Sequence, residues 1–285
     1  MVELPITDNH IHVDPYNGNG ALKVAKIFEK AGGKNLFVIG KPSKSYGITL
    51  RKEEDFKRVF SLVTSFVEEI NKETNVRAFA VVGPYPSEIE NLLERYSLKE
   101  SVEIMKGGID IAIDMVENGD AVAVGEIGRE HYPVTEDRFR ASTEIMKYGI
   151  EEALKRGIAV QIHAEEFSEE QCRELSKIGK KFHFSDNKIV RHFAKPYVKL
   201  YNEYGITPSI LANYNNVKIA LNEGKDFLLE TDYIDDLKRP GAVLGPRNVP
   251  RVTFKLMKEN LLNEEDIYKI HKDLPEKIYG VECKT

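Results

Sequence analysis

Two histidines near the start of the chain stand in a pattern that suits a metal ion. Residues 6–13 read as a β-strand, and in a strand residues two apart point to the same face. Asp8, His10 and His12 are therefore expected to share one face. Imidazole nitrogens and carboxylate oxygens are ligands of zinc and similar divalent ions. A polar surface stripe has the same pattern, so the choice between the two depends on the rest of the chain.

Residues of metal-ligand type stand at the carboxyl ends of four later apolar runs. They are Glu126, His163, His192 and Asp232. Each one alone has an ordinary explanation, such as a buried histidine with satisfied hydrogen bonds or an aspartate that caps a helix. That explanation does not account for their recurrence at equivalent places. Together with the two histidines of the first strand, they predict one metal site at which all six residues converge.

The ligand set is large enough for two ions. Four histidines and two carboxylates can hold a pair of divalent ions about 3.5–4 Å apart, whereas three ligands and an open position suffice for a single catalytic zinc. We assign His10, His12 and Asp232 to one ion, and His163 and His192 to the other. Zinc is the expected metal, and manganese, magnesium, cobalt and nickel are the alternatives.

Three further candidates differ in the role that their position predicts. Glu126 follows a middle strand, so it is expected to bridge both ions. His183 takes the place of His192 if the sixth strand begins earlier than residue 188, but the better apolar run favours His192. His271 lies in the tail of the chain and is expected to be inert.

The elements that must position these residues follow a regular order. Short apolar runs, typical of buried parallel strands, alternate with amphipathic helices such as those expected over residues 21–30, 53–72 and 135–156. The expected strands cover residues 6–13, 36–39, 78–82, 121–124, 158–162, 189–193, 207–211 and 227–229. Ser87 with Glu90 predicts a capping box at the start of one helix.

Eight strand-then-helix units in 285 residues predict an α/β fold, a (β/α)₈ TIM-type barrel that forms a single domain over residues 1–285. In such a barrel the chemistry takes place at the carboxyl ends of the strands, where the six candidate ligands stand. A helical tail from Val252, with Asn263 capping a helix over residues 264–271, is expected to pack outside the barrel.

Composition excludes several other classes of protein. The formal net charge is −5, which excludes a globally basic nucleic-acid binder but not a local basic patch. Two distant cysteines, Cys172 and Cys283, indicate neither a disulfide framework nor a cysteine zinc site. No glycine fingerprint for a dinucleotide and no Walker loop follows a strand. Neither a signal peptide nor an apolar run of membrane-spanning length is present, so we expect a cytoplasmic protein without a membrane partner.

The ordered set of motifs resembles the TatD family of metal-dependent hydrolases, within the amidohydrolase superfamily. The segments that carry the resemblance are His10 to His12, Gly125 to Gly128, His163, His192 and Glu230 to Asp232. The resemblance covers most of the chain and implies a distorted barrel, two divalent ions and phosphodiester hydrolysis, with deoxyribonuclease activity in the best-known members. Many barrel amidohydrolases have a modified lysine on strand four where this chain has Glu126, which favours this family.

Residues around the expected metal site depart from the family pattern. Arg129-Glu130 stands where Leu-Asp is usual, Glu165-Glu166 replaces a basic residue, and the strand-six histidine lacks its Cys-Phe neighbours. Acidic residues near the metals repel successive backbone phosphates. A small anionic substrate or a nucleic-acid end is therefore expected rather than a long duplex.

The predicted function is that of a dinuclear hydrolase in which a metal-activated hydroxide attacks a phosphoester, with Asp232 and Glu126 as the catalytic residues and Asp232 accepting the proton. The alternatives are hydrolysis of an amide, lactone or carboxylic ester, and a metal-binding barrel without catalysis. Substrate contacts are expected from Lys41, Arg129, His131 and Arg247, or else the basic ones are solvated. The sequence leaves the oligomeric state open.

Overall fold

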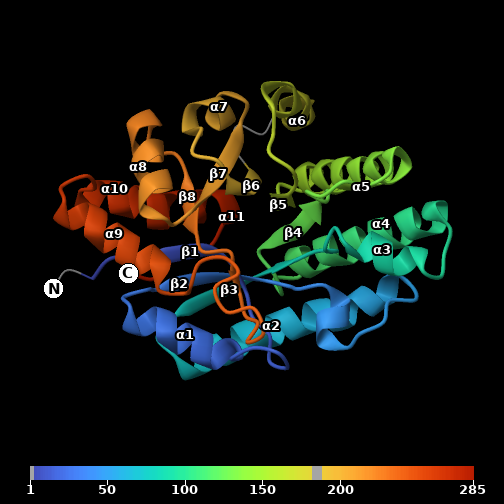
Figure 1. Ribbon diagram of the computed structural model, residues 1–285, viewed down its shortest axis with the longest axis horizontal. Helices are drawn as coiled ribbons and strands as arrows, with labels where there is room; N and C mark the ends of the chain where they lie inside the picture. Colours follow the sequence, from blue (N-terminus) through green and yellow to red (C-terminus); the bar gives the residue numbers. More distant parts are fainter. Residues whose placement is uncertain (1–2, 182–187) are drawn as a thin grey trace.

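The computed structural model describes residues 3–181 and 188–285. In this part of the chain nine parallel strands form one curled sheet, with helices around its outer face (Figure 1). The strand order is β8-β7-β6-β5-β4-β3-β2-β1-β9, so from β1 to β8 each strand lies beside the next one in the chain, as is usual for consecutive elements. The predicted (β/α)₈ TIM-type barrel is confirmed.

The strands are β1 (Thr7–His12), β2 (Asn35–Ile39), β3 (Arg77–Val82), β4 (Ala123–Gly128), β5 (Ala159–His163), β6 (Ile189–Ala194), β7 (Ile206–Leu211), β8 (Leu228–Glu230) and β9 (Tyr233–Ile234). The helices are α1 (Ala21–Lys30), α2 (Phe56–Glu73), α3 (Glu88–Leu93), α4 (Leu98–Glu117), α5 (Glu136–Lys155), α6 (Glu169–Lys181), α7 (Val198–Glu203), α8 (Tyr214–Glu223), α9 (Asn248–Lys258), α10 (Glu264–Tyr268) and α11 (Leu274–Tyr279). Short turns of other helix types are η1 (Ser43–Tyr46), η2 (Glu53–Asp55) and η3 (Lys269–Asp273).

The two ends of the sheet come from one stretch of chain. β8 pairs with β7, β9 pairs with β1, and only Thr231 and Asp232 separate β8 from β9. The sequence predicted a single last strand over residues 227–229 and missed β9. Because the strand is interrupted at this point, Asp232 lies where the two ends of the sheet approach each other.

Two local predictions need correction. β4 covers residues 123–128 instead of 121–124, so Glu126 lies within the strand and not after it. Ser87 precedes α3 but forms no capping hydrogen bond, because its φ of −70° and ψ of −5° are already helical. The capping box belongs to Ser97 and Glu100 at the start of α4, where ψ of Ser97 is 161°, the extended geometry that a capping residue needs.

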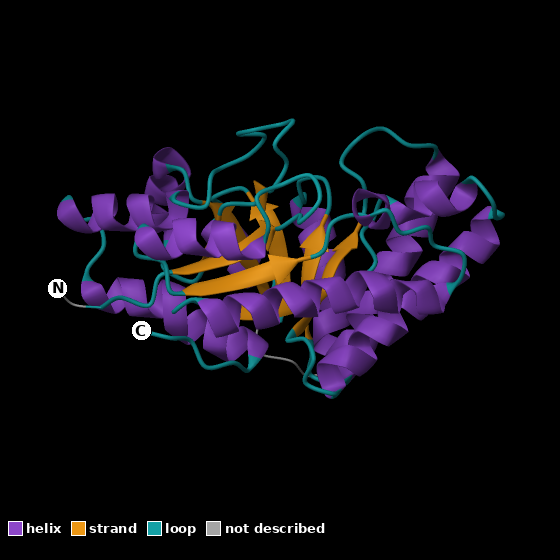
Figure 2. Cartoon of the chain, turned by 90° about the horizontal axis from the view of Figure 1, so that it is seen from below, coloured by secondary structure: helices purple, strands orange, loops and turns teal. Residues whose placement is uncertain are grey.

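The core has an outer and an inner part. Outside the sheet, apolar faces of the helices pack on the strands, as Val24 and Phe28 of α1 and Val63 of α2 do. Burial of each large apolar side chain is worth about 1.5–3 kcal/mol. Inside the barrel, side chains such as Phe37 and Phe79 fill the centre. Helices surround the strands, and long loops gather on one side of the barrel (Figure 2).

The tail does not lie entirely outside the barrel, as the sequence analysis expected. α9 and α10 pack on outer elements, but α11 joins the interior cluster through Ile278 and Tyr279. Interior positions near them hold the small residues Ala123 and Ala159, which leave room for a tyrosine. α11 therefore closes the end of the barrel that lies opposite the carboxyl ends of the strands.

None of the helices in the described ranges is long and apolar enough to cross a membrane. Cys172 and Cys283 are both buried free thiols, in line with the absence of a disulfide framework. The cytoplasmic location stays a prediction.

Candidate metal centre

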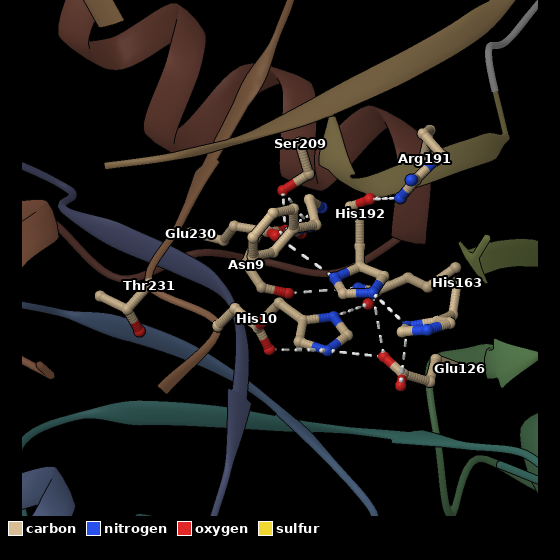
Figure 3. A network of polar contacts seen from close by, with 12 residues as sticks. Asn9, His10, Glu126, His163, Arg191, His192, Ser209, Glu230 and Thr231 are labelled. Carbon is tan, nitrogen blue, oxygen red and sulfur yellow. Dashed lines mark hydrogen bonds and ion pairs between the residues drawn. The ribbon is translucent and has the colours of Figure 1, made fainter. Parts of the chain in front are cut away.

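The fold brings the six predicted ligands together at the carboxyl ends of the strands. They are His10 and His12 from β1, Glu126 from β4, His163 from β5, His192 from β6, and Asp232 from the break between β8 and β9. The imidazoles of His10, His163 and His192 surround the carboxylate of Glu126 (Figure 3). His183, the alternative to His192, lies outside the described residues.

The first cluster consists of His10, His12 and Asp232. Nε2 of His10 lies 3.2 Å from Nε2 of His12. Oδ1 of Asp232 lies 3.5 Å from Nε2 of His12 and 4.0 Å from Nε2 of His10. Metal–ligand bonds to these atoms are about 2.0–2.2 Å long, so ligands of one ion stand at most about 4.4 Å apart. The three ligand atoms therefore fit a single divalent ion.

The second cluster consists of Glu126, His163 and His192. Nδ1 of His163 lies 3.0 Å from Nε2 of His192 and 3.4 Å from Oε1 of Glu126. Oε2 of Glu126 lies 3.3 Å from Nε2 of His192 and 2.9 Å from Nε2 of His10. The carboxylate thus contacts both clusters, which is the geometry that a bridging ligand needs.

The outer nitrogen of three of these imidazoles faces an acceptor. Nδ1 of His10 lies 2.7 Å from Oε1 of Gln161, Nδ1 of His12 lies 3.1 Å from the carbonyl oxygen of Gly40, and Nδ1 of His192 lies 3.3 Å from Oε1 of Glu230. An acceptor keeps the proton on the outer nitrogen and leaves the lone pair of the inner nitrogen free for an ion. The orientation of all three rings is therefore that of metal ligands.

Glu126 supplies the test of whether a metal fits. Both of its carboxylate oxygens are buried, and neither accepts a hydrogen bond of ordinary geometry from the described residues. Burial raises the pKa of Glu126, but the neighbouring imidazoles of His192 and His163 bring it well below its usual range, so the group is ionised. A buried carboxylate that lacks ordinary hydrogen bonds is unfavourable, and a divalent ion between it and the imidazoles would offset that cost.

The pKa values of the histidines indicate where positive charge is favoured. Burial lowers the pKa of His10, yet contact with the carboxylate of Glu126 raises it to about 10. Burial lowers the pKa of His163, and it lowers that of His192 well below the usual range. His163 and His192 therefore favour the neutral form, whereas the carboxylate of Glu126 favours a positive charge beside His10, which a divalent ion would also supply.

Two buried carboxylates that the sequence analysis did not count among the six ligands, Glu230 and Asp8, hold the ligands in place. Glu230 accepts hydrogen bonds from the hydroxyl of Ser209 and, at 2.6 Å, from the backbone N–H of Phe193, and it contacts His192. Burial raises its pKa to about 8. Glu230 belongs to the Glu-Thr-Asp motif of the sequence. Its role as a partner of His192 could not be predicted, because a strand pattern shows which face a side chain is on and not which residue it contacts.

Asp8 was expected beside His10 and His12, and it has a different role. Its carboxylate accepts hydrogen bonds from the backbone N–H of Thr231 at 2.9 Å and from the Thr231 hydroxyl at 2.6 Å. β1 also has an irregular register between Asp8 and Ile11. Asp8 thereby fixes the turn that carries Asp232, whose φ is 46°.

A cavity of about 1170 Å³ opens in front of the two clusters. The predicted ligands that line it are His12, Glu126, His163, His192 and Asp232. His131 also lines it, and its Nδ1 lies 3.0 Å from Nε2 of His163. The expected substrate contact by His131 is therefore compatible with its position.

The basic residues that were expected to bind substrate are placed less favourably. Lys41 lines the cavity, but its ammonium group donates to Asp14 at 2.6 Å. Arg129 is buried, pairs with Glu165 and lies over the ring of Phe139. Arg247 is exposed just before α9. Neither arginine is among the described residues that line the cavity.

Known proteins resemble this chain in sequence and in fold. The profile of the family described as TatD related DNase matches residues 7–280. An uncharacterized protein of Methanocaldococcus jannaschii, MJ1127, is 44% identical over 285 residues, which cover 100% of this chain and 99% of the relative.

Two solved structures have a similar fold. The TatD homologue YJJV from Escherichia coli K12 has a TM-score of 0.66 and 17% identity, with 98% of this chain and 100% of that chain covered. The TatD-like protein AF1765 from Archaeoglobus fulgidus has a TM-score of 0.60 and 19% identity, with 96% of this chain and 100% of that chain covered. At these identities the likeness concerns the fold alone.

Proposed function

Because this chain belongs to the TatD-related DNase family of metal-dependent hydrolases, we propose that it uses two divalent ions to hydrolyse a phosphoester bond. The observation that supports this most strongly is the position of Glu126, a buried carboxylate without hydrogen-bond partners among the described residues that contacts His10 on one side and His163 and His192 on the other. A carboxylate that contacts both clusters can bridge two ions, so its position favours a pair of ions over a single ion.

The distances between the ligand atoms divide the six residues between two metal positions. His10, His12 and Asp232 would hold one ion, and His163 and His192 would hold the other, with Glu126 between them. Zinc is the proposed metal, since imidazole and carboxylate ligands suit it. When bound, such ions polarise a phosphoryl oxygen and lower the pKa of a coordinated water to about 7.

Asp232 is the proposed proton acceptor. One of its oxygens, Oδ1, lies near His12 and His10, and the side chain lines the cavity. The other oxygen would take a proton from the attacking water. Asp8 and Thr231 fix the turn that carries this carboxylate, so the acceptor is held in one orientation.

His131 is the proposed donor to the substrate. Nδ1 of His163 faces Glu126, so Nε2 of His163 carries the ring proton and donates it to Nδ1 of His131. His131 must then carry its own proton on Nε2. A hydrogen-bond donor of this kind in the cavity suits an oxygen of an anionic substrate.

The charges in the cavity favour a small anion or a nucleic-acid end. The four lysines and arginines that line it among the described residues are already engaged: Lys41 with Asp14, Lys195 with Glu166, Arg239 with Asp236, and Arg191 with the carbonyl oxygen of Ala164. A long nucleic acid needs several basic groups that follow its backbone. The proposed substrate therefore carries one or two phosphates.

The test is a side-by-side screen of metal-loaded protein with small phosphoesters, oligonucleotides, lactones, carboxylic esters and amides. Chelator-treated protein serves as the control. We expect turnover of small phosphoesters that disappears with the metal. Turnover confined to lactones, esters or amides would replace the proposed bond type, and steeply salt-dependent cleavage of long DNA would contradict the proposed substrate size.

A further inference from the structure

Tyr85 is a cavity residue that lies close to both metal clusters. It stands on the segment between β3 and α3, and its side chain lines the cavity. Its ring centroid lies 6.3 Å from that of His12, which belongs to the first cluster, and 5.9 Å from that of His163, which belongs to the second. One phenol ring is therefore within reach of both proposed metal positions.

The hydroxyl of Tyr85 differs from the hydroxyls of two buried tyrosines in its partners. Tyr46 and Tyr279 each donate to an oxygen of the protein, at 3.2 Å and 2.8 Å. The hydroxyl of Tyr85 interacts with the carboxylate of Glu126, but neither oxygen of that carboxylate has a hydrogen bond of ordinary geometry among the described residues. A phenol inside a protein usually completes its hydrogen bonding, so the O–H of Tyr85 is placed to donate to a ligand in the cavity.

The neighbours of this hydroxyl favour a donor over a metal ligand. A phenol has an ordinary pKa of about 10 and keeps its proton at neutral pH. Burial raises the pKa of Tyr85, and the charges of Glu126 and Asp232 raise it further. Zinc ligands in proteins are thiolates, imidazoles and carboxylates, so a neutral phenol here is a hydrogen-bond donor to whatever oxygen stands in front of the clusters.

An anion that reacts in this cavity needs neutral donors. The lysines and arginines that line the described cavity already have partners, and His131 lies on the side of His163. In phosphoryl transfer, negative charge is spread over the oxygens of the group that is transferred. A donor held in place before the reaction stabilises such charge without reorganisation. Tyr85 is the cavity residue whose ring approaches a histidine of each cluster.

We propose that Tyr85 is a catalytic residue whose hydroxyl donates a hydrogen bond to a phosphoryl oxygen of the substrate and stabilises the charge on it in the transition state. The inference rests on the proposed phosphoester function and adds a residue to it. The proton stays on the Tyr85 oxygen throughout, so no bond to Tyr85 forms or breaks. The group acts alongside His131, from the other side of the cavity segment that His163 occupies.

The first experiment compares metal-loaded wild-type protein with Tyr85→Phe, which removes the hydroxyl and keeps the ring. The probes are 4-nitrophenyl phosphate and bis(4-nitrophenyl) phosphate, whose leaving group needs no proton. We expect kcat to fall about 10²-fold, the lower end of the effect of removing one donor of this kind, while KM changes little. Elemental analysis of the same samples should give equal metal content.

The second experiment measures binding without turnover. Vanadate, which takes up the five-coordinate geometry of a phosphoryl transition state, and inorganic phosphate are titrated into metal-loaded protein by calorimetry. Tyr85→Phe should bind vanadate at least about ten-fold more weakly and inorganic phosphate almost as well as the wild type. Tyr197→Phe removes a hydroxyl from the same cavity, on the segment before α7, and should match the wild type in kcat and in both affinities.

Several outcomes would overturn the inference. An unchanged kcat in Tyr85→Phe contradicts it, and so does a change confined to KM or an equal loss in Tyr197→Phe. A loss of metal in Tyr85→Phe would make Tyr85 a metal ligand instead. Hydrolysis by both proteins at the same rate contradicts this inference alone. Weaker vanadate binding by Tyr85→Phe, when the wild type hydrolyses no phosphoester, contradicts the proposed function and leaves the donor role of Tyr85 standing.

Discussion

The two ends of the barrel differ in whether their buried polar groups have hydrogen-bond partners. At the amino ends of the strands, His271 is fully buried and both of its ring nitrogens have partners, Thr7 and Thr253. At the carboxyl ends, Glu126 is equally buried and neither oxygen has a hydrogen-bond partner among the described residues. The protein completes the first set of interactions by itself, whereas the second set fits an incoming cation. One end serves stability and the other end serves binding.

Gln161 connects the two ends through the middle of the barrel. Its amide nitrogen donates to the hydroxyl of Tyr279 at 2.9 Å and to the carbonyl oxygen of Asn9 at 3.2 Å. Its amide oxygen accepts from Nδ1 of His10 at 2.7 Å. The C-terminal helix α11 therefore takes part, through one amide, in orienting a candidate metal ligand.

The largest effect is expected from Glu126→Gln. The change removes the charge that both clusters share, so metal content should fall from about two ions per chain to at most one. Elemental analysis after dialysis measures it. Glu166 lines the same cavity but belongs to neither cluster, so Glu166→Gln should keep its metal. If the wild-type protein takes up no zinc, manganese, cobalt or nickel, the interpretation of Glu126 as part of a metal site is wrong.

Asp232→Asn is expected to separate catalysis from metal binding. The amide still offers an oxygen to an ion but no longer accepts a proton, so turnover should fall about 10²–10⁴-fold while most of the metal remains. Rates on the best phosphoester and metal content in the same sample provide the comparison. A variant that keeps most of its turnover shows that another group accepts the proton.

Tyr279→Phe tests whether the closed end affects the open one. Loss of the hydroxyl frees the amide of Gln161 from one partner and loosens its hold on His10. Metal affinity should fall by up to about ten-fold, the lower end of the effect of groups that orient metal ligands. Competition with a chelator measures this. Tyr46→Phe removes another buried, hydrogen-bonded hydroxyl, and an equal loss there would mean that only general stability has changed.

His271 should affect stability and leave the metal centre unchanged. Burial lowers its pKa to about 4, below the ordinary value of about 6.5, so the unfolded chain binds more protons between these pH values. The contribution of His271 to the free energy of unfolding is therefore present above about pH 6.5 and is lost as the pH falls toward 4. Between pH 7 and pH 5 this group should cost about 2 kcal/mol of unfolding free energy.

Urea unfolding at the two pH values measures that difference, and His271→Asn is the comparison. The variant should be less stable at pH 7, and its stability should decrease less between pH 7 and pH 5. The same decrease in both proteins would show that His271 is not the group responsible.

Sequence patterns alone determined the architecture and the chemical type of the site. Apolar strands and amphipathic helices are local patterns, and each element can be recognised within a window of about ten to twenty residues. The rule that parallel strands end on one side then brought His10, Glu126 and His192 to the same end of the barrel. These predictions needed no knowledge of which side chains touch.

Tertiary structure decided everything that depends on a specific partner far away in the chain. Arg129 and Lys41 looked available for a substrate, but each has a carboxylate partner, Glu165 and Asp14, that no local pattern identifies. Asp8 alternates with the histidines and yet binds Thr231, 223 residues later. A hydrogen bond depends on distances of a few tenths of an ångström, and periodicity specifies only a face.

The position of the C-terminal tail also depends on tertiary contacts. Its helices have apolar faces that suit either the outside of a barrel or its interior. Tyr279 enters the interior because Ala123 and Ala159 leave space there and because Asn9 and Gln161 offer partners for its hydroxyl. Space and partners of this kind exist only after the strands have assembled, since they come from residues that are far apart in the sequence.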